Sequence, residues 1–329
     1  MDKPGISVII PNYNGLQLLP QIIPPLLHVL VNAGVEYEII VSDDCSTDES
    51  VKYLKANFPE IIILENKVNS GFSPTINKGI FLAKLPLLML LNSDVKLEPG
   101  YFNPLFHYFE NKDCFGVMGR IIGWNDDVIQ DAAKYPGFHG AKIKTTGNYF
   151  PLEIKNDDML LSMYLSGANA LVSREKILEL KGFDELFAPF YIEDYELSLR
   201  AWRLGWTCYY EHTAICRHKL SSSIKSKSRK AAVQTIYYRN KMILHAIHLS
   251  GNKLIFWYLQ LVPETLIRIF SGRFYYVKSL IAFFRSSKKI KASKEKFKEL
   301  GKHKQALLSI EAVMKKIKDS LSDRAIRHF

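Results

Sequence analysis

The feature that most constrains the fold is a repeated apolar run that ends on a polar tip. The stretch PLLMLLNSDV, residues 86–95, is mostly aliphatic and ends on Asn92, Ser93 and Asp94. The runs ISVIIP, YEIIVSDD and EIIILEN are followed by polar residues in the same way. Fully apolar runs of this length are typical of strands that are buried on both faces of a sheet.

Helical patterns separate these runs. Helices are predicted over residues 16–31, from about residue 48 to 57, and within SGFSPTINKGIFLAKL, residues 70–85. Strands that alternate with helices predict βαβ units, hence an α/β fold with a largely parallel sheet. Because ligands of such sheets bind beyond the carboxyl ends of the strands, the polar tips predict a binding edge.

The second half of the chain has a different pattern. Residues 112–172 are richer in Gly and Asp, with short strand-like runs and no clear helix. SREKILELKGF then predicts a helix capped by Ser173 and ended by Gly182. IEDYELSLRAWRLGW, residues 192–206, predicts another helix with Glu193 and Asp194 in its first turn.

Charge is distributed unevenly along the chain. Residues 1–216 hold 18 basic and 27 acidic side chains, whereas residues 217–329 hold 26 basic and 6 acidic ones, for a net charge of +11. This asymmetry indicates that the second part contacts something anionic. We expect a domain over residues 1–220 and a basic helical region over 221–329, joined by the polar hinge SSSIKSKSRK.

The apolar segment 253–285 leaves two interpretations open. Charges recur in it, so no uncharged run approaches the roughly 20 residues that a membrane-spanning helix needs. It fits a helix in a membrane interface, or a helical part docked on its own core or on a second copy in a homo-oligomer. The following SSKKIKASKEKFKELGKHKQ is predicted to be a solvated helix attracted to anionic headgroups.

Several classes of protein are disfavoured. Four scattered cysteines argue against a disulfide framework and, with no signal-peptide pattern before the first strand, indicate a cytoplasmic protein. The first strand lacks a following Gly-x-Gly-x-x-Gly, so a dinucleotide-dependent dehydrogenase is disfavoured, and no Walker-type loop is present. The basic tail lacks a recognisable nucleic-acid-binding fold, so we expect no nucleic-acid partner.

Together the motifs resemble those of one enzyme family. SVIIPNYNG, IIVSDDCSTDES, LLNSDV and GFDELFAPFYIEDYELSLRAWRLGW occur in the order found in family 2 inverting glycosyltransferases, with NSGFSPTINKGI and SGANALVSREKILELKGF between them. The resemblance covers residues 5–220 and implies the GT-A nucleotide-sugar fold, to which the helices predicted over 221–329 add a C-terminal extension. A Gln-x-x-Arg-Trp motif, which processive members carry, is absent, so the resemblance implies a non-processive enzyme.

The resemblance implies a site for a UDP- or dTDP-sugar. Asp44 would accept from the pyrimidine N3–H, for which a carboxylate is suited because it only accepts hydrogen bonds. Pro11 and Tyr13 would flank the base, and small residues would admit the sugar. The other implied donor-site residues are Asn14, Gly71, Asn77, Asn92, Ser93, Asp94, Gly167 and Ala168. From the residues alone, DDCSTDES also fits an Asx turn that caps a helix through Asp48.

The resemblance also implies Mg²⁺ or Mn²⁺, held in the family by an Asp-x-Asp strand end. Here Asn92 replaces the first Asp, so Asp94 becomes the main carboxylate ligand, with His218 as a second ligand. Imidazole suits Mn²⁺ better than Mg²⁺. The replacement leaves open an alternative, a nucleotide-sugar-binding protein that kept the pocket and lost metal-dependent turnover.

The implied catalytic groups are Asp194, as general base, and Glu193, which would position the acceptor. From the residues alone, acidic side chains in a first helical turn can also serve only to complement the helix dipole. The expected reaction moves one sugar, with inversion, to a glycan or lipid-linked acceptor of a bacterial surface polysaccharide. We expect a peripheral protein at the inner face of the membrane.

Overall fold

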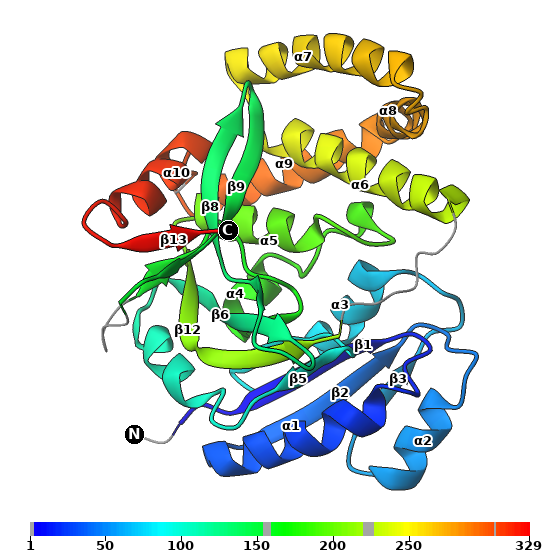
Figure 1. The fold of residues 1–329 in the computed structure, drawn as a ribbon, viewed down its shortest axis with the longest axis vertical. Coiled ribbons are helices and arrows are strands. Elements are labelled where there is room, and N and C mark those ends of the chain that lie inside the picture. Colours follow the sequence, from blue (N-terminus) through cyan, green and yellow to red (C-terminus); the bar gives the residue numbers. More distant parts are fainter. Residues whose placement is uncertain (1–2, 154–158, 220–226, 306) are drawn as a thin grey trace.

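The fold is built on one large sheet with helices on both sides (Figure 1). This computed structural model describes residues 3–153, 159–219, 227–305 and 307–329. Most of the predicted hinge, residues 221–230, lies outside these ranges. The sheet has ten strands within the described residues, and eight of them form the path β10-β12-β6-β11-β4-β1-β2-β3. The predicted α/β architecture is therefore confirmed.

The first four strands supply the parallel half of the sheet. They are β1 (Ile6–Asn12), β2 (Tyr37–Asp43), β3 (Ile62–Glu65) and β4 (Leu87–Leu91). Strand β1 lies between β2 and β4 and is parallel to both. The side chains of Ile6, Val8, Ile9 and Ile10 are completely buried. Fully burying each such side chain contributes about 1.5–3 kcal/mol, which explains the apolar runs.

The remaining strands extend the sheet past β4. Strand β11 (Asn169–Ser173) is antiparallel to both β4 and β6 (Cys114–Gly123), whereas β12 (Thr207–His218) is parallel to β6. Strands β10 (Leu160–Leu161) and β5 (Val95–Leu97) pair with β12, and β7 (Ile129–Asp131) pairs with β6. The pairing of β5 with β12 brings residues near 95 and 218 together.

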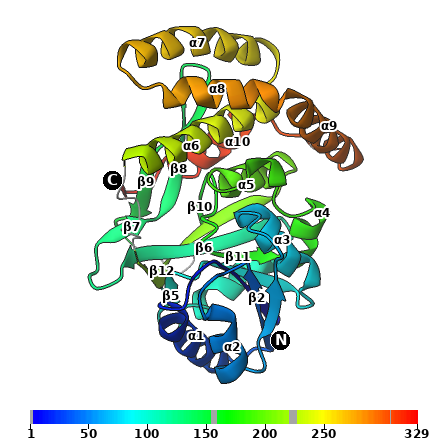
Figure 2. The same cartoon turned by 90° about the vertical axis from the view of Figure 1, so that its right-hand side faces the viewer.

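The helices that precede β12 flank the large sheet. On one side of β1–β3 are α1 (Leu19–Ala33) and α2 (Ser50–Asn57), and on the other is α3 (Phe72–Leu82) (Figures 1 and 2). The remainder are η1 (Asn103–Glu110), α4 (Arg174–Glu179), η2 (Glu185–Phe187) and α5 (Glu193–Arg203). The predicted Ser173 cap of α4 is confirmed. Helix α2 begins two residues later than predicted, because Asp48 accepts from Ser50 N–H and holds the preceding turn.

A second, three-stranded sheet stands beside the first. It consists of β8 (Ala133–His139), β9 (Lys142–Pro151) and β13 (Ile326–His328), with β9 in the middle. The sequence predicted helices to the end of the chain, and this was wrong for residues 326–328. These residues pair antiparallel with Tyr149–Pro151, because the edge of β9 offers backbone groups that a short segment can satisfy.

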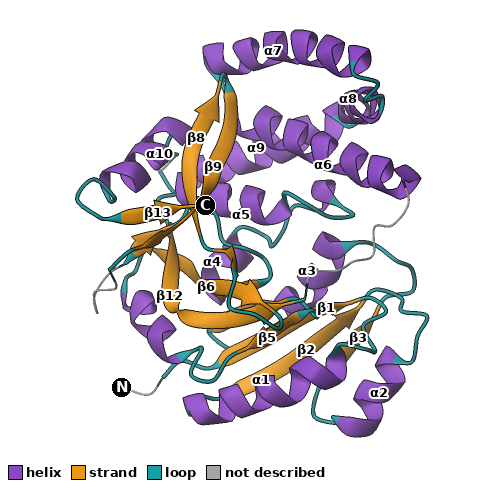
Figure 3. Cartoon of the chain, viewed as in Figure 1, coloured by secondary structure: helices purple, strands orange, loops and turns teal. Residues whose placement is uncertain are grey.

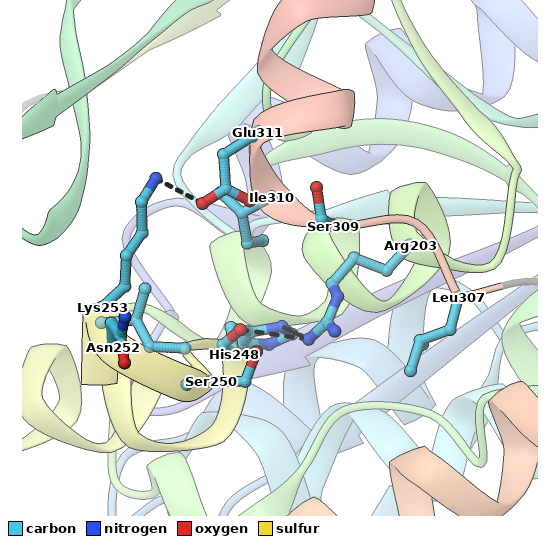
Figure 4. Close-up of a pocket in the computed structure, with 11 residues that line it drawn as sticks. Arg203, His248, Ser250, Asn252, Lys253, Leu307, Ser309, Ile310 and Glu311 are labelled. Carbon is cyan, nitrogen blue, oxygen red and sulfur yellow. Dashed lines mark hydrogen bonds and ion pairs between the residues drawn. The ribbon is translucent and has the colours of Figure 1, made fainter. Parts of the chain in front are cut away.

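The C-terminal helices gather at the end of the molecule opposite the parallel strands (Figure 3). They are α6 (Lys227–His248), α7 (Gly251–Phe270), α8 (Tyr275–Arg285), α9 (Ser287–His303) and α10 (Ile310–Asp319). Side chains anchor them to α5. Arg203 Nε donates to Leu308 O at 3.0 Å, and His248 Nε2 lies 3.4 Å from a Glu196 oxygen. A polar cavity of about 600 Å³ lies at this junction (Figure 4).

Helix α7 is the outermost element of this end (Figure 1). One of its faces is apolar and exposed. Its inner face is held by the buried side chains of Trp257 and Leu261. Large apolar side chains that are at least half exposed are Ile255, Phe256, Leu259, Val262, Leu266, Ile267 and Phe270. Within the part of the chain that the structure describes, no helix is both long and apolar enough to span a membrane.

Candidate active site

Polar groups linked by hydrogen bonds lie at the carboxyl ends of β1 and β2. Asp44 Oδ1 accepts from Asn66 Nδ2 at 2.8 Å and from Ser70 N–H at 2.7 Å, and Oδ2 accepts from Gly71 N–H at 2.9 Å. A carboxylate offers about four acceptor positions. One position on Asp44 Oδ2 therefore stays open for a ligand, although the side chain is almost completely buried.

The loops after β1 and β2 hold each other in place. Asn14 has a positive φ of 53°, and its Oδ1 accepts from Thr47 N–H at 2.8 Å. Pro11 lies opposite Ser42 in the sheet, one residue before the end of β1. Tyr13 follows the strand and is 53% exposed, so its ring is accessible. The structure thus brings Pro11, Tyr13 and Asn14 to the rim that carries Asp44.

Two other residues of the predicted donor site have mainly internal contacts. Gly71 has φ +86°, and a Cβ there would come within 2.6 Å of Pro189 Cα, so a side chain does not fit. Asn77 is buried, and its amide donates to Phe183 O at 2.9 Å and accepts from Phe183 N–H at 2.8 Å. A donor contact for either residue stays a prediction.

A candidate metal site forms where β5 meets β12. His218 pairs with Val95 in the sheet, which puts its Nε2 3.4 Å from Asp94 Oδ2. His218 Nδ1 lies 3.0 Å from Gln130 Oε1, a hydrogen bond that orients the ring. A ring nitrogen and a carboxylate oxygen thus face each other, and both are groups that bind metal ions.

The donor set fits a hard divalent cation. Asn92 Oδ1 and Asp94 Oδ1 are both buried without a hydrogen-bond partner among the described residues. Buried oxygens of this kind are normally bonded, so each is available to a ligand, an ion or a water. No cluster of three or more His, Cys, Asp or Glu that could hold a metal occurs in the described ranges. A divalent ion bound here would take further ligands from phosphates or water.

A short turn connects this rim to the start of α5. Asn92 N–H donates to Ala168 O at 3.1 Å, and Gly167 N–H donates to Asp194 Oδ2 at 3.4 Å. Ser93 lies between Asn92 and Asp94 and is half-buried. The turn at Gly167 and Ala168 therefore brings the two predicted halves of the site together.

Glu193 and Asp194 are two adjacent buried carboxyl groups. Burial, and then the charge of Asp194, raise the pKa of Glu193 to about 8. Burial also raises the pKa of Asp194, although N–H groups of Tyr195 and Gly167 and the charge of Lys134 oppose the shift. Glu193 Oε2 is buried without a partner among the described residues. Such a pair holds a proton near neutral pH and can pass it on, as acid–base catalysis requires.

Sequence reasoning missed Lys134, which acts on this pair. It is 5% exposed, forms an ion pair with Asp131, and burial lowers its pKa to about 8. Its Nζ lies 5.2 Å from the centre of the Tyr164 ring. Sequence reasoning also missed Gln130, which orients His218. Both lie in the Gly- and Asp-rich middle of the chain, where no pattern distinguishes them.

The loop before α5 is strained and is held by α6. Tyr191 and Ile192 both have φ +75°, which is costly for these side chains. Asn240 of α6 donates to the carbonyl oxygens of Phe187, Phe190 and Tyr191 at 2.6, 3.0 and 2.8 Å. This buried amide fixes the backbone that delivers Glu193 and Asp194.

Comparison with known proteins identifies the family. Residues 7–180, just over half of the chain, match Glycosyl transferase family 2. The chain belongs to this family. TuaG of Bacillus subtilis, a glycosyltransferase assigned to teichuronic acid biosynthesis, is 24% identical over 250 residues, which are 74% of this chain and 90% of TuaG. An uncharacterized glycosyltransferase of Haemophilus influenzae is 24% identical over 198 residues, 59% of this chain and only 61% of that protein.

A further family 2 relative and a solved structure complete the comparison. An N-acetylglucosaminyl-diphospho-decaprenol L-rhamnosyltransferase of Mycobacterium tuberculosis is 24% identical over 208 residues, 56% of this chain and 67% of that protein. A crystal structure of GalNAc-T7 with UDP, GalNAc and Mn²⁺ superposes with a TM-score of 0.67 at 15% identity, over 97% of this chain and 57% of that one. The chain has the GT-A fold predicted from its motifs.

Proposed function

We propose that this family 2 protein is a non-processive, inverting glycosyltransferase that moves one sugar from a UDP- or dTDP-sugar to a glycan or lipid-linked acceptor. The observation that carries the proposal is the Gly167–Ala168 turn. It links a buried carboxylate pair, Glu193 and Asp194, to an edge with unpartnered oxygens on Asn92 and Asp94. A base is thereby set close to a place for a leaving diphosphate.

On the donor side, the open acceptor position of Asp44 would take the pyrimidine N3–H, which uracil and thymine share. The exposed ring of Tyr13 and the backbone at Pro11 would flank the base. Asn14, Gly71, Asn77 and Ser93 would shape this part of the site. A carboxylate here would favour bases with a ring N–H donor, as uracil and thymine have at N3, over cytosine, whose N3 only accepts.

Asp94 and His218 would hold Mg²⁺ or Mn²⁺, with the Asn92 amide oxygen at its edge. When bound, such an ion would supply Lewis-acid stabilisation of the departing diphosphate. Gln130 orients the His218 ring so that Nε2 faces Asp94. Because Asn92 brings no charge, this chain would rely on a single carboxylate and on the phosphates of the donor.

On the acceptor side, Asp194 would take the proton of the attacking hydroxyl, and Glu193 would position that hydroxyl. The raised pKa of Glu193 keeps it protonated near neutral pH, so it can donate a hydrogen bond while Asp194 stays the acceptor. Lys134 favours the ionised form of Asp194. Gly167 and Ala168 leave room for the donor sugar. Direct attack opposite the diphosphate would invert the anomeric centre.

We further propose that the chain works at the inner face of a bacterial membrane in cell-surface polysaccharide synthesis. Relatives named for teichuronic acid synthesis and for a diphospho-decaprenol acceptor support this. The transferase region, residues 1–220, would be carried by the basic helical region, residues 221–329. The exposed apolar face of α7 would lie in the interface, flanked by basic side chains. The charge of the helical region disfavours a homo-oligomer through this face, since two such surfaces repel.

A second candidate function is a nucleotide-sugar-binding protein without turnover. The replacement at Asn92 favours it, since it removes one carboxylate from the metal site. The buried pair Glu193 and Asp194 disfavours it, because keeping two carboxyl groups buried destabilises a protein that does not use them.

The proposal is tested by incubating the protein with UDP- and dTDP-sugars and Mn²⁺ and measuring release of the nucleoside diphosphate. We expect slow hydrolysis of one donor by the unmodified protein and no hydrolysis by Asp194→Asn. NMR of the released sugar should show that the anomeric configuration has been inverted. The exposed Asp319→Asn serves as the matched control and should keep the activity. Donor binding without hydrolysis in the unmodified protein would favour the second candidate.

A further inference from the structure

A second cavity, of about 290 Å³, lies between α6, α7, α8 and the β8–β9 hairpin. The hairpin reaches α7, where Ala141 N–H donates to Gln260 Oε1 at 3.0 Å. Aromatic rings from α6, α7 and α8 form much of the cavity wall. Its charged and aromatic lining residues are Lys142, Lys144, Tyr237, Tyr238, Lys241, Trp257, Glu264, Arg268 and Tyr276. Neither the donor site nor the metal site includes any of them.

The cavity has more positive charge than its own residues neutralise. Glu264 is its one carboxylate, and it forms an ion pair with Lys142. Lys144, Lys241 and Arg268 form no ion pair with any described residue. Among the described residues, Lys241 Nζ has the Tyr237 hydroxyl, at 3.2 Å, as its one hydrogen-bond partner.

Arg268 is the most confined of these cations. Its guanidinium carbon lies 4.5 Å from the ring centres of both Tyr238 and Tyr276, and its Nη1 is buried without a partner among the described residues. A buried guanidinium donor without an acceptor is costly, and a phosphate oxygen is the acceptor that matches it best. The cavity therefore has the chemistry of a phosphate site.

The cavity adjoins the loop that carries the catalytic pair. The ring of Tyr237, which lines the cavity, packs edge-on against Tyr191 with centres 6.0 Å apart. Tyr191 stands three residues before Asp194. Helix α6 carries both the cavity residues Tyr237 and Lys241 and the loop anchor Asn240. A molecule held in the cavity would thus end next to the acceptor side of the proposed active site.

The other boundary of the cavity is α7. Trp257 and Leu261 of α7 line the cavity, while the opposite face of the helix carries the exposed apolar side chains. A helix with its side chains is about 10–12 Å across. An anion in the cavity would therefore lie within one helix diameter of the surface that we place in the membrane interface.

We propose that this cavity binds the diphosphate of a polyprenyl-linked acceptor, with Lys144, Lys241 and Arg268 as the contacting cations. This rests on the proposed function, because it supplies the site for its acceptor. The lipid would remain at the membrane beside α7, and the sugar attached to the diphosphate would point past Tyr237 toward Glu193. Phosphate oxygens are also present in phospholipid headgroups and in free pyrophosphate, so the test separates these sources.

The test is binding of the full chain to phosphatidylcholine vesicles that contain either a polyprenyl diphosphate or phosphatidylglycerol. The double variant Lys144→Gln/Lys241→Gln is compared with Lys52→Gln/Lys55→Gln, which removes the same charge from the exposed surface of α2. We expect the cavity variant to bind the polyprenyl diphosphate vesicles at least about tenfold more weakly. Binding to the phosphatidylglycerol vesicles should weaken only slightly, and to the same extent, in both variants.

Three results would overturn the proposal. These are an equal loss in both variants, a cavity-variant loss as large on phosphatidylglycerol as on the diphosphate lipid, and no loss at all. Pyrophosphate in solution should compete only weakly, and full competition would mean a site for the free anion instead. Titration of UDP into the same proteins reports separately on the donor site. Failed UDP binding with intact lipid discrimination would contradict the proposed function and leave the acceptor site standing.

Discussion

Glu193 and Asp194 lie in the same buried environment. The protonation of this pair can be measured through the pH dependence of stability. Glu193 holds its proton up to about pH 8 in the folded protein, against a value of 4.5 for an unperturbed side chain. The folded state thus binds more protons than the unfolded chain between these two values. Stability must therefore fall as pH rises through this window.

We expect Glu193→Gln to remove this pH dependence. Relative to the unmodified protein, its free energy of unfolding should increase between pH 5 and pH 8 by roughly 1–3 kcal/mol. Urea unfolding of both proteins at the two pH values checks this. Glu60→Gln, on the exposed surface near α2, is the matched control and should run parallel to the unmodified protein. If the stability of Glu193→Gln changed with pH in the same way as that of the unmodified protein, Glu193 would not be protonated as assigned here.

Asn92 stands where a second carboxylate would strengthen the proposed metal site. Asn92→Asp restores a second carboxylate beside Asp94, and we expect at least about fivefold tighter Mn²⁺ binding in the presence of UDP, because a nearby charge is worth about 1 kcal/mol or more. Electron paramagnetic resonance of free Mn²⁺ measures this. Asn57→Asp, exposed at the end of α2, adds the same charge elsewhere and should leave the affinity unchanged. An equal gain in both variants would mean a general charge effect.

The motif residues of the site could be predicted from the sequence because each ends a recognisable apolar strand or opens a helix. Asp44, Asp94 and Asp194 are of this kind. Lys134 and Gln130 could not, since their interactions with Asp194 and His218 join segments that are distant in the sequence. The internal contacts of Asn77 were likewise invisible, because its partner Phe183 is more than 100 residues away.

At the scale of elements, α6 matters because it fixes the loop before α5. Asn240→Ala leaves three carbonyl oxygens without their donor, and we expect a loss of about 1–3 kcal/mol in stability. Because the loop also positions Glu193 and Asp194, the proposed catalytic pair, kcat should fall while the affinity for UDP stays the same. Gln234→Ala, an exposed amide on the same helix, should change neither. Weaker UDP binding in Asn240→Ala would show that α6 supports the donor side instead.

The order of strands and helices in the first half followed from periodicity, because each element there buries one apolar run. Strand β13 did not, since three residues carry no pattern and their pairing with β9 uses backbone groups. The β8–β9 hairpin was likewise only a region of short strand-like runs. Its contact with α7 depends on Gln260, a polar residue that no periodicity singles out.

For the molecule as a whole, substitutions on the exposed face of α7 can distinguish a contact with a membrane from a contact with a second subunit. Phe256 and Phe270 are 62% and 87% exposed, so Phe256→Ser/Phe270→Ser should fold normally. We expect it to bind phosphatidylglycerol vesicles at least about tenfold more weakly, since each buried aromatic ring contributes about 1.5–3 kcal/mol. Unchanged vesicle binding, together with loss of a dimer in sedimentation, would place a second copy on this face.

In the proposed function, Asp94 helps to hold a metal-dependent nucleotide site. Calorimetric titration of UDP and dTDP, each with and without Mn²⁺, into the unmodified protein, Asp94→Asn and the control Asp319→Asn tests it most directly. We expect Mn²⁺ to strengthen binding in the unmodified and control proteins, and Asp94→Asn to abolish that gain. Nucleotide binding that is indifferent both to Mn²⁺ and to Asp94 would contradict the metal assignment and the role given to Asp94.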